Sequence, residues 1–162
     1  MRRLEERDLE VLNRELPLWY AEGWADRLRR QTRMQLVQAV AWDGATPLGR
    51  GMLLFAEDEG YSESAARERC AEVRDLWVAE PFRRRGVATA IMAFLEEASR
   101  VAGYARVGFS VSLDDEHAAA RSLYERLGYV HAHGPFVIST VLDGDDGPIP
   151  VGDVVTYLVR DL

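Results

Sequence analysis

The sequence predicts a single α/β (α+β) domain in which helices flank a mixed, mainly antiparallel β-sheet. One observation behind this prediction is a strand–helix–strand unit over residues 70–113. Such a unit produces a parallel strand pair joined by a right-handed crossover. The other observation is that hairpins are expected on either side of this unit, and the strands of a hairpin are antiparallel neighbours. A chain of 162 residues, of which 48% are apolar, has the size and composition of one globular domain spanning residues 1–162.

The opening third of the chain is predicted to be helical. Leucines recur at helical spacing through "ERDLEVLNREL" (6–16), and a second helix is expected over "EGWADRLRRQTR" (22–33). Trp19, Tyr20 and Trp24 lie in this region. We expect them to fill the core between the helices, and the lining of a substrate pocket is the alternative.

Three strands are predicted to follow. Two short apolar runs, 36–42 and 47–55, flank the dipeptide Asp43-Gly44, which favours a hairpin turn. The polar stretch 57–69 is expected to be an exposed loop, and "CAEVRDLWV" (70–78) is expected to be the third strand.

The most regular helix of the chain comes after the third strand. Its apolar residues fall on one face, and Gly103 ends the pattern. The segment "ARVGFSVSL" (105–113) then alternates between apolar and small or polar residues, as a strand does. The apolar face of the helix consists of Val87, Ile91, Phe94, Leu95 and Ala98.

The last part of the chain is predicted to hold one helix and two strands. Asp114 and Asp115 are candidate N-caps of a helix that Gly128 ends. The two strands are expected at 129–138 and 154–162, and the acidic segment 143–150 is expected to be the loop that joins them.

Composition narrows the classes of function. The single cysteine, Cys70, allows neither an internal disulfide nor a cysteine-based zinc cluster, and His131 and His133 lack a third ligand, so no metal site is expected. The net charge of −7 argues against nucleic-acid binding. The charged start of the chain is unlike a secretory signal peptide, and no apolar run is long enough to cross a bilayer. We therefore expect a cytoplasmic protein without membrane association.

The stretch "EPFRRRGVAT" (80–89) is predicted to bind an anion. It joins the third strand to the most regular helix, and the first N–H groups of a helix lack internal partners and lie at the positive end of its dipole. Gly86 permits close approach to the backbone, and the three preceding arginines add positive charge. Neither a nucleoside-triphosphate P-loop motif nor a dinucleotide fingerprint is present. A solvated charged turn is the alternative interpretation.

Two segments of the chain resemble the GCN5-related N-acetyltransferase (GNAT) family. Arg83-Arg84-Arg85-Gly86-Val87-Ala88 resembles the Arg/Gln-x-x-Gly-x-Gly/Ala signature for acetyl-coenzyme A (acetyl-CoA). "AAARSLYERLGY" resembles the family helix that ends in Leu-Tyr-Glu-x-Leu-Gly-Phe/Tyr, and the two segments occur in the family's order. The resemblance covers residues 70–130 and implies a GNAT-like acyl-CoA acyltransferase fold, in which the central parallel strands splay apart around the cofactor.

The resemblance also implies how acetyl-CoA is bound. Its pyrophosphate would lie on backbone N–H groups of the arginine–glycine loop, and its pantetheine arm would pair with the third strand as an added strand does. His117 stands where many members carry an asparagine that contacts the cofactor or the reacting centre. The implied cofactor-binding residues are Leu76, Trp77, Val78, Arg83, Arg84, Arg85, Gly86, Val87, Ala88, Thr89 and His117.

The implied reaction is acetyl transfer from acetyl-CoA to a primary amine of a small molecule or a protein by direct attack. Tyr124 matches the family's tyrosine and would protonate the departing thiolate, while a core aromatic is the alternative. Glu72 corresponds to the glutamate of histone-acetylating members and would remove a proton from the amine. The alternative for Glu72 is an exposed strand carboxylate paired with Arg74 or a neighbour. Asp75, on the same strand, is the alternative base, although strand alternation places it on the opposite face unless a bulge intervenes.

Other functions stay open from the sequence. One alternative is a sensor of the same fold that binds acyl-CoA at the arginine–glycine loop but catalyses no reaction. Another is a structural partner domain in which the arginines face solvent. Acceptor pockets in the family come from the variable ends of the chain, so the sequence does not name the amine. Dimers are common in the family, which leaves a homodimer open.

Overall fold

The computed structural model describes residues 1–16, 18, 23–144 and 147–162. Trp19 and Tyr20 lie outside these residues. Trp24 is 1% exposed and packs with Leu12 and Leu16, in agreement with its expected place in a core between helices.

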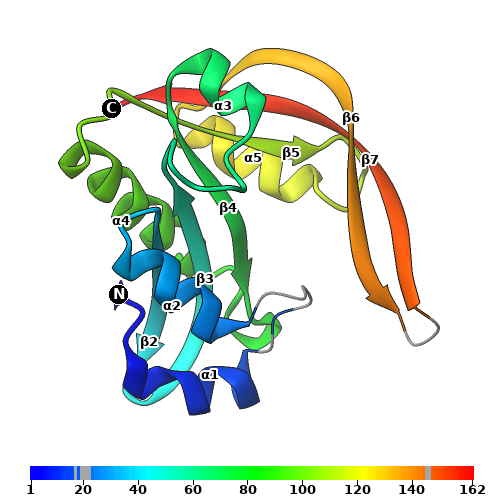
Figure 1. Cartoon of the computed structure of the whole chain (residues 1–162). Coiled ribbons are helices and arrows are strands. Elements are labelled where there is room, and N and C mark those ends of the chain that lie inside the picture. The colour runs from blue at the N-terminus through cyan, green and yellow to red at the C-terminus, as the bar shows by residue number, and fades with distance from the viewer. Residues whose placement is uncertain (17, 19–22, 145–146) are drawn as a thin grey trace.

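A seven-stranded sheet forms the centre of the fold (Figure 1). Its strand order is β1-β2-β3-β4-β5-β7-β6, and every pair of neighbours is antiparallel except β4 and β5. The predicted mixed, mainly antiparallel sheet is therefore confirmed. The strands are β1 (Arg2–Arg3), β2 (Leu36–Asp43), β3 (Thr46–Leu54), β4 (Ala71–Val78), β5 (Arg106–Ser112), β6 (Val130–Gly144) and β7 (Gly147–Asp161).

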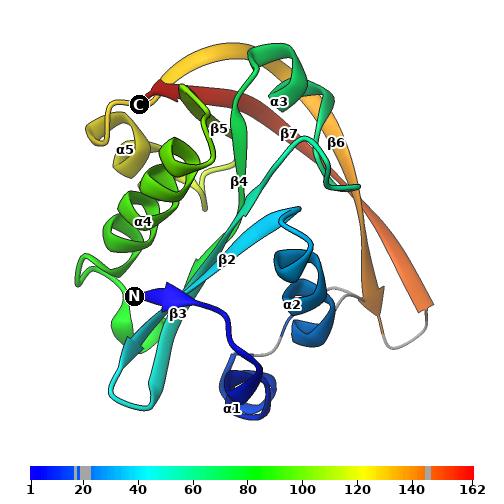
Figure 2. The same cartoon turned by 60° about the vertical axis from the view of Figure 1, so that its left-hand side comes forward.

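Helices cover both faces of this sheet (Figure 2). Neighbouring residues of β2 show the division, because Ala39 packs with the core under α4, whereas Val40 packs with Leu12 and Trp24 on the opposite face. Within the described residues, no helix combines the length and apolar character needed to span a membrane. The helices are α1 (Leu9–Glu15), α2 (Trp24–Thr32), α3 (Glu63–Glu68), α4 (Val87–Val101) and α5 (Ala118–Arg126), with short 3₁₀ turns η1 (Glu6–Asp8) and η2 (Glu80–Phe82).

The prediction of an exposed loop over 57–69 is wrong, because this segment contains α3. Ser62 caps the helix, and its hydroxyl oxygen accepts a hydrogen bond from the Ala65 N–H at 3.1 Å. Ala65 is fully buried against Tyr157 of β7. A short helix with one buried residue shows little apolar periodicity, so tertiary packing rather than sequence pattern stabilises it.

Two predicted boundaries also differ from the structure. His117 occupies the N-cap position of α5, and Asp114 instead accepts a hydrogen bond from the His117 N–H at 2.9 Å. The segment 143–150 is not wholly a loop, since β6 runs to Gly144 and β7 begins at Gly147. Pairing across the ladder extends both strands beyond the apolar residues that mark them in the sequence.

The parallel strands β4 and β5 pair only at their beginning. Their register joins Ala71 to Val107 and Glu72 to Gly108, after which the pairing ends although both strands continue. The expected splayed pair is thus confirmed. On the β5 side, the backbone of β4 from Val73 onward has no strand partner among the described residues.

A bulge at Asp75 interrupts β4, with Val73 and Arg74 between it and the segment that pairs with β5. The register with β3 shifts between Arg50 and Met52, and the φ angle of Asp75 is 50°, in the left-handed region. Arg27 Nη1 and Arg50 Nε donate hydrogen bonds to Asp75 Oδ2 at 2.6 Å and 2.7 Å. Both arginine side chains are 0% exposed. Two buried guanidinium groups, one from α2 and one from β3, therefore hold the bulge.

Asp75→Asn is expected to destabilise the protein by about 3–5 kcal/mol, because it removes the charge that compensates two buried arginines. Asparagine keeps the side-chain shape and tolerates a positive φ. The loss of stability therefore measures the effect of removing the charge and not an effect on the backbone. Urea unfolding followed by tryptophan fluorescence measures the change.

Asp43→Asn in the exposed hairpin turn is the matched control and should stay within about 0.5 kcal/mol of the unmodified protein. If Asp75→Asn costs less than about 1 kcal/mol, the ion pairs do not hold the bulge.

Candidate functional site

The arginine–glycine loop lies between η2 and the first turn of α4. Arg84 and Gly86 both have positive φ angles, 63° and 79°, and Gly86 is the N-cap of α4 without a side-chain cap. A Cβ at Gly86 would meet no atom within 4 Å, so the glycine serves the backbone conformation rather than close packing. No acceptor is found within the described chain for the N–H groups of Val87, Ala88 and Thr89. The turn thus presents a row of free donors.

A cavity of about 510 Å³ adjoins this loop on the α4–α5 face of the sheet. Its lining contains three arginines, Arg83, Arg84 and Arg126, and no acidic residue. The free N–H groups and the arginines together make the cavity suitable for an anion. The other lining residues are Val78, Phe82, Gly86, Val87, Ala88, Thr89, Ala119, Ser122 and Leu123.

The three consecutive arginines have different positions. Arg83 Nε donates a hydrogen bond to the Val78 carbonyl at 3.0 Å, which ties the loop to the end of β4. Arg84 lines the cavity, whereas Arg85 lies outside its lining, with its guanidinium 5.9 Å from the centre of the Phe82 ring. Arg126 of α5 joins the site from the other side. Sequence reasoning missed Arg126, although it lies two residues after Tyr124 on the motif helix.

Of the other residues expected to bind the cofactor, some line this cavity and some do not. Val78 lines it, whereas Trp77 packs toward α1 and α2, with the Arg50 guanidinium 4.9 Å from its ring centre. The Leu76 side chain packs in the core under α4. His117 lines neither cavity described in this section, and its Nδ1 lies 2.6 Å from Asp114 Oδ1. This hydrogen bond lowers the pKa of Asp114.

Tyr124 lies on α5, with its ring against β5. The side chain is buried at 8% exposure, and its ring centre is 4.3 Å from that of Phe109. Burial raises the pKa of Tyr124 to about 12, so the phenol keeps its proton at neutral pH. No hydrogen-bond partner for the hydroxyl occurs among the described residues. Tyr124 therefore meets one requirement of a general acid, because its hydroxyl keeps its proton and does not donate it to another described residue.

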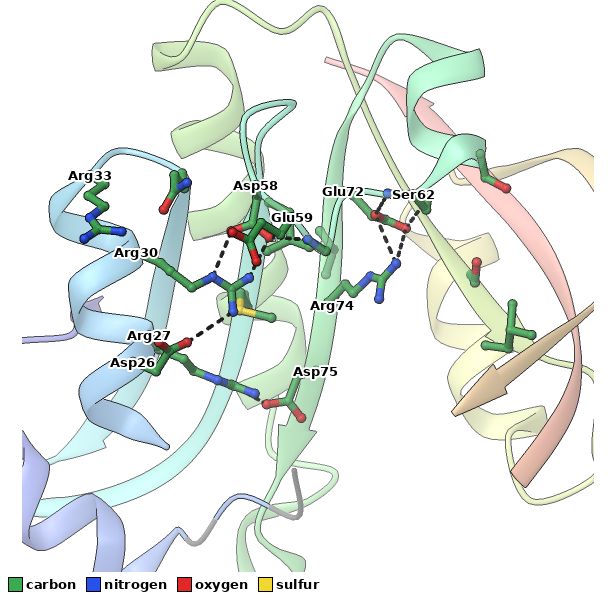
Figure 3. Close-up of a pocket in the computed structure, with 18 of the residues that line it drawn as sticks. Asp26, Arg27, Arg30, Arg33, Asp58, Glu59, Ser62, Glu72, Arg74 and Asp75 are labelled. Carbon is green, nitrogen blue, oxygen red and sulfur yellow. Dashed lines mark hydrogen bonds and ion pairs between the residues drawn. The ribbon is translucent and has the colours of Figure 1, made fainter. Parts of the chain in front are cut away.

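A second cavity, of about 980 Å³, lies on the α2–α3 face (Figure 3). It is bounded by α2, by β4, by the segment before α3, and by Phe136, Ile138 and Ser139 of β6. Most of its charged groups are paired, as in the contact of Arg30 with Asp58 at 2.6 Å. The two cavities therefore lie on opposite faces of the sheet, at the strands that part.

Glu72 borders this second cavity and is 1% exposed. Its carboxylate accepts hydrogen bonds from the Ser62 N–H at 3.0 Å and the Ser62 hydroxyl at 2.8 Å, and Arg74 lies 3.4 Å away (Figure 3). Sequence reasoning considered Arg74 as a partner but missed Ser62, because the contact crosses from the segment before α3.

Asp75 borders the same cavity as Glu72, which the bulge in β4 explains. Regular alternation would place the two carboxylates on opposite faces. The contacts with Arg27 and Arg50 occupy the Asp75 carboxylate, so its clearest role is to hold the bulge.

No group of three or more potential metal ligands is found in the described part of the chain. His131 is exposed, whereas His133 is directed toward α3, where its Nε2 contacts Ser64. The two histidines therefore have separate surroundings.

Comparison with solved structures shows the fold of this chain in several proteins. A ribosomal-protein-alanine N-acetyltransferase from Brucella melitensis has a TM-score of 0.67 at 18% identity, with 99% of this chain and 98% of that chain covered. The protein yncA from Salmonella typhimurium, solved with acetyl-CoA, has a TM-score of 0.67 at 15% identity, with 99% and 92% covered. The paia N-acetyltransferase from Thermoplasma acidophilum, in complex with coenzyme A, has a TM-score of 0.64 at 14% identity, with 99% and 97% covered.

Sequence comparison supplies the family. No curated protein matches the chain significantly. The sequence model of the acetyltransferase (GNAT) family, however, matches residues 1–129, which is most of the chain and includes both motifs. The chain therefore belongs to the acetyltransferase (GNAT) family.

Proposed function

We propose that this protein is an N-acetyltransferase, a single domain over residues 1–162, that transfers the acetyl group of acetyl-CoA to a primary amine by direct attack. The observation that carries the proposal is the cavity beside the arginine–glycine loop. It combines three arginines, no acidic residue and the free N–H groups of the first turn of α4. A ligand with several phosphates is the natural occupant of such a site.

The residues present fit acetyl-CoA. The Arg83 N–H, which the sequence prediction included, donates to the Glu80 carbonyl at 3.2 Å, so the N–H groups of residues 84–88 would bind the pyrophosphate. Arg84 and Arg126 would add charge-assisted hydrogen bonds. The free edge of β4 at Leu76, Trp77 and Val78 would pair with the pantetheine arm as a strand pairs with its neighbour. Because β4 and β5 part after Glu72, the thioester would lie between the two cavities. Two of the similar structures contain acetyl-CoA or coenzyme A, which supports this assignment.

The acceptor amine would enter from the second cavity, where Glu72 lies. An alkylammonium ion must lose a proton before its nitrogen can attack a carbonyl carbon. Glu72 would accept that proton through water, since its carboxylate is buried at the cavity wall. The Ser62 contacts would hold the carboxylate in a fixed position for this role.

Tyr124 would donate a hydrogen bond and a proton to the thiolate that leaves. Attack forms the nitrogen–carbon bond, and collapse of the adduct breaks the carbon–sulfur bond. Over the whole reaction the ammonium nitrogen loses two protons, of which one ends on the coenzyme A sulfur and the other reaches solvent. The site must therefore accept two protons from nitrogen and deliver one to sulfur.

A non-catalytic acyl-CoA sensor is the second candidate, and one observation favours it. The Glu72 carboxylate already accepts two hydrogen bonds from Ser62 and lies beside Arg74, as a structural carboxylate would. Turnover separates the two candidates. The test is the release of coenzyme A during incubation of acetyl-CoA with a panel of primary amines.

Binding of acetyl-CoA is expected to raise the melting temperature. At about 100 times its Kd the ligand adds about 2.7 kcal/mol, which corresponds to roughly 5–10 °C for a domain of this size. A shift without coenzyme A release for any amine would favour the sensor, and no shift at high ligand concentration would contradict both candidates.

Gly86→Val is expected to abolish the acetyl-CoA-induced shift in melting temperature, because a branched side chain would project from the turn that binds the pyrophosphate. The substitution also strains a backbone with φ of 79°, at a cost of about 1–2 kcal/mol.

Gly44→Val is the matched control. Gly44 also has a positive φ, 56°, and open space around its Cα, but it lies in the hairpin turn between β2 and β3. Both variants should lose comparable stability, and only Gly86→Val should lose the ligand effect. An unchanged ligand-induced shift in Gly86→Val would contradict the loop assignment.

Tyr124→Phe is expected to lower kcat by about 10²-fold or more, because it removes the proton donor for the thiolate. Its melting temperature should change little, since the hydroxyl has no partner in the described structure. With a pKa of about 12, the phenol stays protonated through the alkaline assay range, so its ionisation should cause no fall in rate below about pH 11.

Tyr129→Phe provides the opposite control. The Tyr129 hydroxyl donates to Glu96 Oε1 at 2.9 Å within the core, so its removal should cost about 1–3 kcal/mol of stability and leave kcat unchanged. A Tyr124→Phe variant with unchanged kcat would rule out the acid role.

A further inference from the structure

We propose that Ser64, His133 and Glu68 form a proton relay that opens on the second cavity, from which the amine would enter. The relay takes one of the two protons that the amine loses. This inference rests on the proposed acetyl transfer. It adds a second proton acceptor beside Glu72, built from a part of the chain outside both sequence motifs.

The three side chains form a continuous hydrogen-bonded row. Ser64 Oγ lies 3.0 Å from His133 Nε2, and His133 Nδ1 lies 3.3 Å from Glu68 Oε1. A hydroxyl within hydrogen-bond reach of an imidazole, itself oriented by a carboxylate, is the arrangement that activates hydroxyl groups in enzymes. Here the segments that supply it, α3 and β6, are distant in sequence and lie side by side in both views (Figure 1).

The surroundings of Glu68 determine which histidine nitrogen carries the proton. Arg106 Nη1 donates to Glu68 Oε2 at 3.0 Å, so the carboxylate is held as an acceptor on both oxygens. Its Oε1 faces His133 Nδ1, which must then be the protonated nitrogen, since a lone pair there would oppose the carboxylate. His133 Nε2 consequently presents its lone pair to the Ser64 hydroxyl. A proton taken up by Ser64 from the cavity can therefore pass to His133.

Ser64 is the member of the row that reaches the substrate space. It lines the 980 Å³ cavity together with Glu72, whereas His133 lies behind it. The His133 side chain is 19% exposed and stacks on the Tyr157 ring at 5.1 Å. Register shifts in β6 on both sides of His133 show that the strand departs from regular pairing here. Such irregularities redirect side chains, and they are frequent beside active sites.

The chemistry of the reaction leaves a role for this second acceptor. A carboxylate holds one proton at a time, and that of Glu72 already accepts two hydrogen bonds from Ser62 and lies beside Arg74. In the relay, Ser64 Oγ would accept a proton from nitrogen as its own proton moves to His133 Nε2. The imidazolium formed would be stabilised by Glu68, and the proton would then pass to solvent.

Two charged groups, Glu68 and Arg106, lie close to His133 in the described part of the chain. Glu68 contacts it from α3, and Arg106 of β5 reaches it only through Glu68. Tyr157 of β7, whose ring stacks on His133, and the nearby Cys70 are further titratable groups, and burial raises the pKa of both, to about 11 for Cys70. Both are therefore neutral where a histidine titrates. Only the neutral form of the His133 ring can accept the proton that Ser64 passes on.

The first measurement is the pH dependence of kcat/KM. His133→Gln is expected to lower kcat/KM by about 10²-fold and to change its pH profile, because glutamine cannot accept the proton. His131→Gln, two residues earlier on the same strand and exposed, is the matched control and should keep the wild-type profile. Ser64→Ala should lose as much as His133→Gln, whereas Ser64→Thr should recover most of the rate. A wild-type pH profile in His133→Gln would overturn the relay.

The second measurement does not depend on turnover. NMR of the histidine ring nitrogens in the full-length protein should show the Nδ1–H tautomer for the neutral His133 ring, and Glu68→Gln should change the tautomer ratio. If no amine is acetylated while this tautomer is observed, acetyl transfer is wrong and the relay geometry stands without its substrate role. If amines are acetylated and the Nε2–H tautomer is found, the relay is wrong and acetyl transfer stands.

Discussion

The carboxylate of Asp75, held between Arg27 and Arg50, is the constraint on which the architecture of the site depends. It joins α2, β3 and β4 in one buried set of ion pairs and fixes a residue with φ of 50°. Holding a non-glycine residue in this region costs about 1–3 kcal/mol, which persists only where surrounding contacts determine it. The bulge follows the last residue of β4 that pairs with β5, so the strain lies where the sheet opens.

The opening of the sheet gives the two faces different chemistry. On the α4–α5 face, a cavity without acidic residues collects arginines and free N–H groups. On the α2–α3 face, carboxylates and guanidinium groups line the other cavity and are mostly paired. In the proposed reaction, acetyl-CoA between the two cavities would be held by its phosphates from one face, and its thioester would meet the amine from the other. The proposed relay extends the second face, because α3 and β6 bring Ser64 and His133 together there.

Local patterns predicted most of the elements and the cofactor side of the site. Arg83, Gly86 and Ala88 follow one another in a single turn, so their relation is visible in the sequence alone. Tyr124 is likewise predicted by the helix that carries its motif. Glu72 and Asp75 show the limit, because alternation places them on opposite faces and only the bulge brings both to one cavity. The bulge depends on two arginines distant in sequence, which no local pattern reveals.

The sequence by itself determined most of the helices and strands and the place of the arginine–glycine loop before α4, since each follows from periodicity or from a contiguous motif, whereas the splayed parallel pair is what the resemblance to the GNAT family implies. The tertiary structure alone decided that 63–68 is a helix, that Ser62 holds Glu72, and that Arg126 lines the same cavity as Arg83 and Arg84. It also decided that His133 meets Ser64 and Glu68, 69 and 65 residues away. The physical reason is that these features depend on contacts between segments whose meeting is set by the packing of the whole sheet.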